Sequence, residues 1–446
     1  MLDGNATGYI VDATALVNPI TLTNTQIDVK SDNVILMDLR NAGILNTLGL
    51  APQLMSYLAG TTISGGSNAY TYKYAVVDGS TLNINSDINK NNMSTTSDDY
   101  IFTRRLLLQN SIINVNGGKT VTANLNTTDL AGIDSNLTVP VGLAVAASSH
   151  SVNNATTGIL NDGTVNVNRT DSGNGGVGLY VNYGHINNNG SGVVNVETTG
   201  NNPNAVGIYA TNNTPVVNNG TVTVGGNKSF GILGLSYRLD NSGAMVDPSL
   251  EAYYEASNSV LGEYGKVNIT NNGTITVTND SAIGIYAHNN SLSAANATDQ
   301  RAASDIKAVN NGTVNTNGGN NSIGMGTNRG TLTNASAGII NVNGTVSAGM
   351  YGTNSSVLTN NGTINVGATA SGTESIGIYT DDINTPITTS GTINVGTSSY
   401  GVFGKNINMI GGTINIGDNG VGVYSTGPNV NVNGTINAGN NNAVGV

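Results

Sequence analysis

Short segments of alternating aliphatic and polar residues recur along most of this chain. Ten times in its C-terminal two thirds the sequence reads Gly-Thr-(Ile/Val)-Asn-Val or a near copy, and most copies are followed by (Ser/Ala)-Ile-Gly-Ile-Tyr. In the copy that starts at Gly362, Ile364 and Val366 alternate with Thr363 and Asn365. Successive side chains of a strand point to opposite faces, so the pattern predicts a β-strand with its aliphatic residues inside and its Thr and Asn in water.

The second phrase predicts another strand of the same kind. In the copy from Ser375 to Tyr379, the alternation places Ile376 and Ile378 in the interior and Gly377 and Tyr379 outside. A third, weaker strand runs into an Asn-Asn-Gly corner, where Asn and Gly tolerate left-handed backbone angles and favour a turn.

The spacing of the phrases predicts how these strands are arranged. Apart from two longer gaps, successive copies of the first phrase lie roughly 21 to 29 residues apart, which suits a coil of three short strands and three turns. The sequence therefore predicts an all-β protein that folds as a single-stranded parallel β-helix, right-handed by the rule for parallel crossovers. Asn residues at equivalent corners would form hydrogen-bonded ladders. A β-propeller is the main alternative, but it needs about 40 residues per blade.

The regular coil is predicted over residues 159–446, and residues 1–158 form an irregular N-terminal head with degenerate repeats at Ser80–Asn85 and Ser111–Asn116. Two apolar stretches in the head, Ile35–Arg40 and Ile44–Leu58, predict short helices. The head is interpreted as a cap of the coil, with a separate domain as the alternative.

Two insertions interrupt the repeats, at about residues 236–265 and 289–307. The first predicts an amphipathic helix, because Asp247 precedes Pro248 at a helix start and an apolar stripe follows at helical spacing, at Leu250, Tyr253, Tyr254, Ser257 and Leu261. The second is rich in Ala. Insertions in solenoids are often binding loops, although each could instead cover the flank of the coil.

The insertions hold the residues that we predict to bind a ligand. They combine aromatic rings with charged groups, at Tyr237, Arg238, Asp240, Tyr253, Tyr254, Asp299 and Arg301. Aromatic and Arg side chains often dominate binding at protein surfaces.

A further candidate is the last residue of the second phrase. In successive coils this position holds Tyr180, Tyr209, Leu233, Tyr286, Gly326, Tyr351, Tyr379, Phe403 and Tyr424. Stacked coils would align these residues into a column that could bind sugar faces or partner side chains. The favoured interpretation is that the rings stack on one another and stabilise the coil.

The amino-acid composition indicates which partners and which compartment suit this protein. Only 9% of the 446 residues are charged, the net charge is −11, and there are 60 Gly and no Cys. An acidic chain disfavours nucleic acid and anionic membranes as partners. No apolar run is long enough to span a membrane, and no signal peptide is visible. A cytosolic protein can simply lack Cys, but a chain without Cys also suits secretion through an oxidising compartment, which the Asn-rich, charge-poor repeats favour.

Catalytic motifs are scarce. His150, His185 and His288 are scattered and lack the spacing of a metal site, so no metal, cofactor or catalytic residue is predicted. A β-helix enzyme that degrades polysaccharides is an alternative, because it would use clustered carboxylates. The candidates for that role are Asp98, Asp99, Asp129, Asp134, Asp381 and Asp382.

The phrases at Asn360–Val366 and Ser375–Tyr379 resemble the passenger region of type V autotransporter adhesins, and in particular the large fusobacterial outer-membrane adhesins. The resemblance implies display on the bacterial cell surface and attachment to a receptor or glycan on host cells, or to partner bacteria. It also implies that this chain is a piece of a longer protein, which we expect to be monomeric. A passive structural spacer within such an adhesin is the other function that the repeats suit.

Overall fold

The computed structural model describes most of the chain from residue 112 onward. The described residues are 112–125, 140–146, 157–198, 202–236, 238–240, 261–264, 266–289, 306–317, 319–367 and 375–446, together with short strands and one further residue before position 110. They form strands and turns, with no helix among them. The chain divides into two compact units, residues 1–202 and 203–446.

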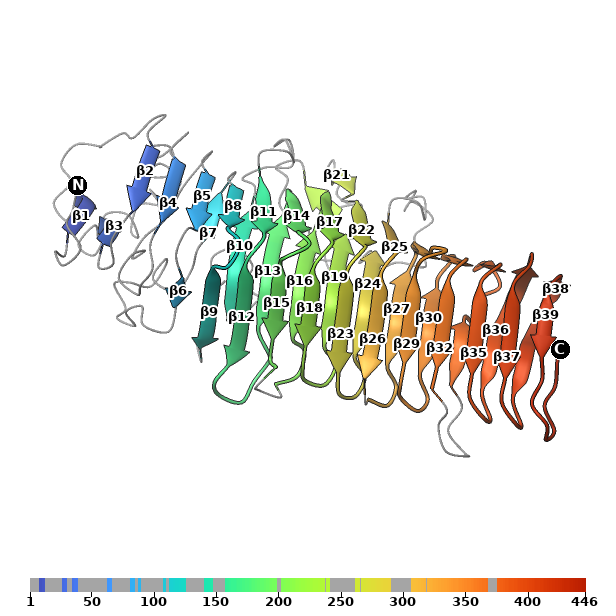
Figure 1. Ribbon diagram of the computed structural model, residues 1–446. Coiled ribbons are helices and arrows are strands. Elements are labelled where there is room, and N and C mark those ends of the chain that lie inside the picture. The colour runs from blue at the N-terminus through green and yellow to red at the C-terminus, as the bar shows by residue number, and fades with distance from the viewer. Residues whose placement is uncertain are drawn as a thin grey trace. The chain divides into compact units, whose positions relative to one another are not determined.

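From β5 (Thr81–Ile84) onward, the strands of both units form coils of three strands that follow one another in a fixed order (Figure 1). Row 1 holds the Gly-Thr-Ile-Asn-Val strands, row 2 the Ile-Gly-Ile-Tyr strands and row 3 the strands that precede the Asn-Asn-Gly corner. Within each unit, strands of one row pair in parallel with the equivalent strands of the neighbouring coils. The predicted parallel β-helix is therefore confirmed.

The first unit holds the shorter rows. Row 1 consists of β6 (Ile88–Asn89), β9 (Thr120–Leu125), β12 (Thr164–Arg169) and β15 (Val193–Val196). Row 2 consists of β7 (Leu107–Gln109), β10 (Val141–Ala146) and β13 (Val177–Asn182). Row 3 consists of β2 (Gln26–Val29), β4 (Thr62–Gly65), β5 (Thr81–Ile84), β8 (Ile112–Val115), β11 (Gly158–Asn161) and β14 (His185–Asn188).

In the second unit, row 1 consists of β18 (Thr221–Val224), β23 (Thr274–Thr278), β26 (Thr313–Asn317), β29 (Ile339–Val342), β32 (Thr363–Val366), β35 (Thr392–Val395), β37 (Thr413–Ile416) and β39 (Thr435–Asn437). Row 2 consists of β16 (Val206–Thr211), β19 (Phe230–Ser236), β24 (Ile283–Asn289), β27 (Ile323–Asn328), β30 (Ala348–Thr353) and β33 (Ile376–Tyr379). Row 3 consists of β17 (Thr214–Asn218), β22 (Val267–Asn271), β25 (Ile306–Asn310), β28 (Thr331–Asn334), β31 (Val357–Asn360) and β34 (Ile387–Thr389). Two long strands, β36 (Tyr400–Met409) and β38 (Val421–Val432), extend both row 2 and row 3.

The core consists of aliphatic columns, because each coil sets its buried residue on the equivalent residue of the next. In row 1 of the second unit, Ile340, Ile364, Ile393 and Ile414 are register partners in succession, and all four are fully buried. Burying one such side chain contributes about 1.5–3 kcal/mol. The alternation of the first phrase thus determines the interior as predicted.

The second phrase departs from its predicted alternation. Gly377 and Ile378 are both buried, and Ile376 is half-exposed like Tyr379. The prediction that Ile376 lies inside and Gly377 outside is therefore wrong. The reason is steric, because a Cβ on Gly377 would lie 2.4 Å from the Gly401 carbonyl oxygen and 2.5 Å from Cγ2 of Ile393. Only a residue without a side chain fits at this bend of the coil.

The N-terminal part contains more strands than predicted. The degenerate repeats are confirmed as β5 and β8, which pair in register as Thr81 with Ile112 and Leu82 with Ile113. The helix predicted over residues 35–40 is wrong, since Val34–Asp38 is strand β3, which pairs in parallel with β1 (Gly8–Asp12). Its run of Val, Ile and Leu suits a strand better than a helix. Residues 44–58 lie outside the described residues.

The first insertion begins and ends as an antiparallel pair, β20 (Arg238–Asp240) with β21 (Leu261–Tyr264). Leu261, predicted as the end of a helical stripe, is therefore the first residue of a strand. Pairing with β20 overrides the helical spacing. The other four residues of the stripe lie outside the described residues.

Buried Asn side chains form a ladder at the corner that follows row 3, as predicted. In the second unit Asn218 donates to Asn271, Asn271 to Asn310, Asn310 to Asn334 and Asn334 to Asn360, with N···O distances of 2.7–2.9 Å. These five amides are fully buried. In the first unit, Asn161 donates to Asn188 at 2.8 Å. The ladder satisfies polar groups that burial would otherwise penalise.

One buried position of row 1 interrupts the aliphatic columns. Thr316 is the register partner of Val277 and Val342, only 1% of its surface is exposed, and its hydroxyl has no hydrogen-bond partner. We predict that Thr316→Val stabilises the second unit by about 1–2 kcal/mol, because it removes an unsatisfied hydroxyl and restores the column. Urea unfolding measures the change. Thr313→Val, on the outer side of the same strand, is the control and should change stability by less than about 0.5 kcal/mol.

The ladder gives a second prediction. Asn334→Ala removes the acceptor of Asn310 and the donor of Asn360, both buried, and should destabilise the second unit by about 2–4 kcal/mol. Asn365→Ala removes one rung from the half-exposed ladder outside row 1, where water can replace the lost bonds, and should cost less than about 1 kcal/mol. Equal losses of stability in the two variants would contradict the role assigned to the buried ladder.

Candidate functional site

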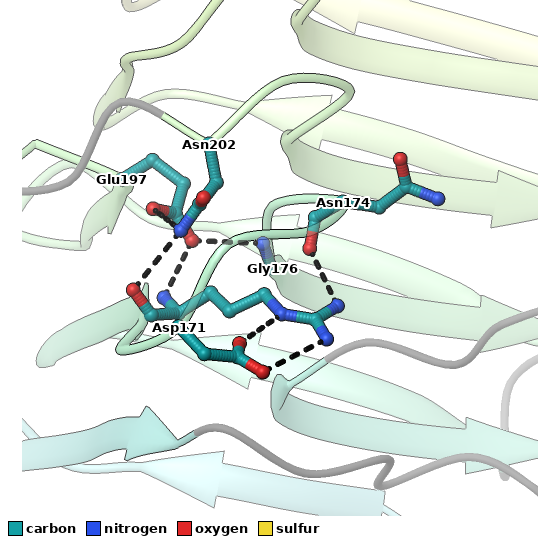
Figure 2. Close-up of polar contacts among 6 residues, drawn as sticks. Asp171, Asn174, Gly176, Glu197 and Asn202 are labelled. Carbon is teal, nitrogen blue, oxygen red and sulfur yellow. Dashed lines mark hydrogen bonds and ion pairs between the residues drawn. The ribbon is translucent and has the colours of Figure 1, made fainter.

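The described residues bring several charged groups together at one corner of the first unit (Figure 2). Arg169 ends β12, and the loop of residues 170–176 leads from it into β13. One coil later, Glu197 and Asn202 lie on the segment that leads from β15 toward the next strand of row 2. We call Arg169, Asp171, Asn174, Gly176, Glu197 and Asn202 the corner cluster.

Glu197 is the buried carboxylate of this cluster, with only 1% of its surface exposed. Its Oε1 accepts the backbone N–H of Arg169 at 2.6 Å and that of Gly176 at 3.0 Å, and its Oε2 accepts Nδ2 of Asn202 at 3.4 Å. Its own backbone is left-handed, with φ of 52°. Burial raises the pKa of Glu197 above its usual value, although the three hydrogen bonds act in the opposite direction.

Arg169 is held on the solvent side of the same loop. Its Nε donates to Oδ1 of Asp171 at 2.5 Å and its Nη1 to the carbonyl of Asn174 at 3.0 Å. The hydrogen bond from Arg169 and its charge lower the pKa of Asp171, which is exposed. The loop is closed around the guanidinium, since a Cβ on Gly173 would lie 2.6 Å from Cζ of Arg169.

The charged side chains of the corner cluster are paired with other groups of the cluster. The carboxylate of Glu197 is directed at backbone N–H groups of the preceding coil, and Arg169 is paired with Asp171 within its own loop. This geometry ties two successive coils together at a corner, and we interpret the cluster as a corner lock. Sequence reasoning missed it, because Glu197 and Arg169 are 28 residues apart and belong to no motif.

The structure describes only part of the predicted ligand-binding set. Arg238 and Asp240 lie on β20, at register positions opposite Tyr264 and Leu261. The other five, Tyr237, Tyr253, Tyr254, Asp299 and Arg301, lie outside the described residues. Their role in binding stays a prediction.

The two insertions nevertheless leave the coil at the same place. The first departs after Ser236 and returns before Val267, and the second departs after Asn289 and returns before Ile306. Ser236 is the register partner of Asn289, and Val267 is the register partner of Ile306. Both insertions therefore emerge between rows 2 and 3 of neighbouring coils, so the predicted binding residues belong to adjacent excursions.

The predicted aromatic column is formed on row 2. In the second unit, Tyr351 pairs with Tyr379, Tyr379 with Phe403, and Phe403 with Tyr424. Their ring centroids are 5.6, 5.3 and 4.8 Å apart. The rings thus lie against one another, as in stabilising aromatic pairs. In the first unit, Tyr180 occupies the equivalent position and is fully buried. These contacts support the interpretation that the column stabilises the coil.

The structure describes two of the three histidines and two of the six carboxylates considered for an enzyme, the adjacent Asp381 and Asp382. His288 stacks on Tyr286 at 5.4 Å, and His185 begins β14. Asp382 accepts hydrogen bonds from the backbone N–H groups of Ser355 and Asn384. Burial would raise the pKa of Asp382, but these bonds, a hydrogen bond from Thr385 and the charge of Lys405 together hold it below its usual value. His150, Asp98, Asp99, Asp129 and Asp134 lie outside the described residues.

The described residues include no group of three or more His, Cys, Asp or Glu side chains placed to hold a metal ion. Within the same part of the chain, no helix is long and apolar enough to cross a membrane.

The corner lock gives a prediction about pH. A carboxyl whose pKa is raised on folding contributes stability that is complete below its unfolded pKa, about 4.3, and is lost as the pH rises through the folded value. Glu197→Gln removes this loss and keeps an acceptor for Arg169 and Gly176. The variant should therefore gain stability relative to the wild type as the pH rises from 4 toward neutrality. Urea unfolding at a series of pH values measures the difference, and a difference that does not change with pH would contradict the assignment.

No family model, curated protein or solved structure matches this chain. Its function must therefore be inferred from the arrangement of its own residues.

Proposed function

We propose that this protein is an adhesin at the bacterial cell surface, non-enzymatic and part of the passenger of a type V autotransporter. It attaches the cell to a glycan or protein receptor on host cells, or to partner bacteria. The resemblance of its repeats to those of such adhesins motivates the proposal. The observation that carries it is the shared exit of the two insertions, at one corner of neighbouring coils.

The coil suits this role because the residues that stabilise it are different from the residues that we propose to contact a partner. Aliphatic columns fill the interior of the coil, and the amides of the buried Asn ladder pair with one another between coils. Solenoids tolerate such excursions and often use them for binding. Two excursions on adjacent coils can engage one partner together, which strengthens attachment through a raised effective concentration.

A passive spacer is the second candidate. The aromatic column favours it, because rings that lie against one another have less of their faces available to a ligand. In this case the coil would hold another part of a longer protein away from the cell, and the insertions would have no effect on attachment.

Deleting the first insertion tests whether the protein is an adhesin or a passive spacer. Replacing residues 241–260, between β20 and β21, with a short Gly-Ser linker keeps the strand pair and the coil. The adhesin proposal predicts that binding of the purified protein to epithelial cells and to bacteria falls at least about tenfold, equivalent to about 1.4 kcal/mol. Flow cytometry with labelled protein measures binding.

The matched control replaces residues 368–374, which connect β32 of row 1 to β33 of row 2, rather than a row 2 strand to a row 3 strand. This variant should bind as the wild type does. Circular dichroism and urea unfolding establish that both variants keep the coil. Full binding by the variant that lacks residues 241–260 would contradict a role for the first insertion and favour the spacer.

A further inference from the structure

The outer side of row 1 in the second unit is a regular surface of Thr and Asn residues, with Ile339 as its one apolar member. It consists of two columns, which we call the Thr/Asn face. One column holds Thr221, Thr274, Thr313, Ile339, Thr363, Thr392, Thr413 and Thr435; the other holds Thr223, Thr276, Asn315, Asn341, Asn365, Asn394, Asn415 and Asn437. All sixteen residues are half-exposed or exposed. None is charged, although the chain has a net charge of −11.

The Asn column is an ordered ladder. The Nδ2 of each Asn from Asn341 to Asn437 donates to Oδ1 of the equivalent Asn one coil earlier, at 2.6–2.8 Å. An amide has two N–H donors and an oxygen with two lone pairs, so the ladder uses one donor and one lone pair of each internal Asn. The ladder fixes these side chains and leaves hydrogen-bonding capacity on the solvent side.

The chemical groups on the Thr/Asn face suit some classes of ligand and not others. Cations favour carboxylates, and phosphates or sulfated polymers favour Lys and Arg, none of which lies on the face. Protein interfaces usually depend on aromatic or Arg anchors, which the face also lacks. Amide and hydroxyl groups both donate and accept hydrogen bonds, as sugar hydroxyls do. The face is therefore complementary to a neutral polyhydroxyl ligand.

The repetition of the face points to a polymer. Parallel strands lie about 4.8 Å apart, so from Thr363 to Asn437 the same hydroxyl and amide recur at that interval along the coil axis. A linear polysaccharide laid along the axis would meet an equivalent pair of columns at each coil. Individual contacts would be weak, but their number along one chain would raise the overall affinity.

We propose that the Thr/Asn face binds a neutral, unbranched polysaccharide that lies along the coil axis. The inference rests on the proposed attachment function and adds a ligand class to it. It assigns the contact to the wall of the coil, in addition to the insertions.

Affinity electrophoresis tests the proposal directly. Native gels that contain hydroxyethyl cellulose, linear mixed-linkage β-glucan or glucomannan should retard the wild-type protein, whereas gels with hyaluronan or heparin should not. In the variant Thr363→Glu with Thr413→Glu, two coils apart on the face, the apparent affinity should fall at least about tenfold. The matched control is Thr333→Glu with Thr388→Glu, also half-exposed and two coils apart but in row 3, which should be retarded like the wild type.

Several results would overturn the proposal. They are no retardation by any of the three neutral polymers, equal retardation of the face variant and the control, or retardation by heparin alone. A concentration-dependent dimer in light scattering that disappears in the face variant, without retardation by neutral polymers, would assign the face to a second copy of the chain instead.

Cell binding measured in parallel separates this inference from the proposed function. Protein that attaches to cells but is not retarded by the neutral polymers overturns only the polysaccharide assignment. Protein that is retarded but attaches to no cell overturns the adhesin proposal and leaves the polysaccharide site in place.

Discussion

The parallel, in-register pairing of equivalent residues in successive coils is the interaction on which the rest of the structure depends. Thr363 pairs with Thr392 and Asn365 with Asn394, and the same relation holds along each row within a unit. A residue type that recurs at the same position of successive coils therefore forms a column. Recurring aliphatic residues form the core, recurring Asn residues form a hydrogen-bonded ladder, and recurring Gly residues allow close backbone contacts. A chain with few charges and many Asn and Gly can fold because its polar groups satisfy one another between coils.

This constraint also determines where function can be placed. A residue inside the coil faces its equivalents on both neighbouring coils, so a change there disturbs two interfaces. Residues outside the rows are free of this requirement, and the chain places its irregular segments there. In the second unit two such segments leave from one corner, while the Thr/Asn face on row 1 is uncharged and follows the repeat of the coils. These features offer two kinds of contact, one local and one repeated along the coil.

Much of the fold could be predicted from the sequence, because a strand with one buried face shows its alternation directly. The core of row 1 and the aromatic column follow from the two phrases, and the buried Asn ladder follows from the Asn-Asn-Gly corner. The burial of Gly377 could not be predicted from alternation, since the obstacle is Ile393 and the Gly401 carbonyl, which lie opposite it only after the coils stack. Leu261 was misassigned because its strand partner, β20, is 21 or more residues away. The corner lock had no sequence signal, since Glu197 acts on backbone N–H groups of another coil. The seven predicted binding residues remain a prediction.

Cysteine pairs test the register most directly, because the protein has no Cys of its own. Register partners in parallel strands lie within the Cα separation of about 4.4–6.8 Å that a disulfide requires, whereas residues displaced by two positions lie beyond about 7 Å. Mild oxidation of the variant Thr363→Cys with Thr392→Cys should give an intramolecular disulfide, detected by mass spectrometry of proteolytic peptides. The variant Thr363→Cys with Asn394→Cys should remain reduced under the same conditions. Efficient bridging of the displaced pair, or none of the aligned pair, would contradict in-register stacking and the columns, ladders and face derived from it.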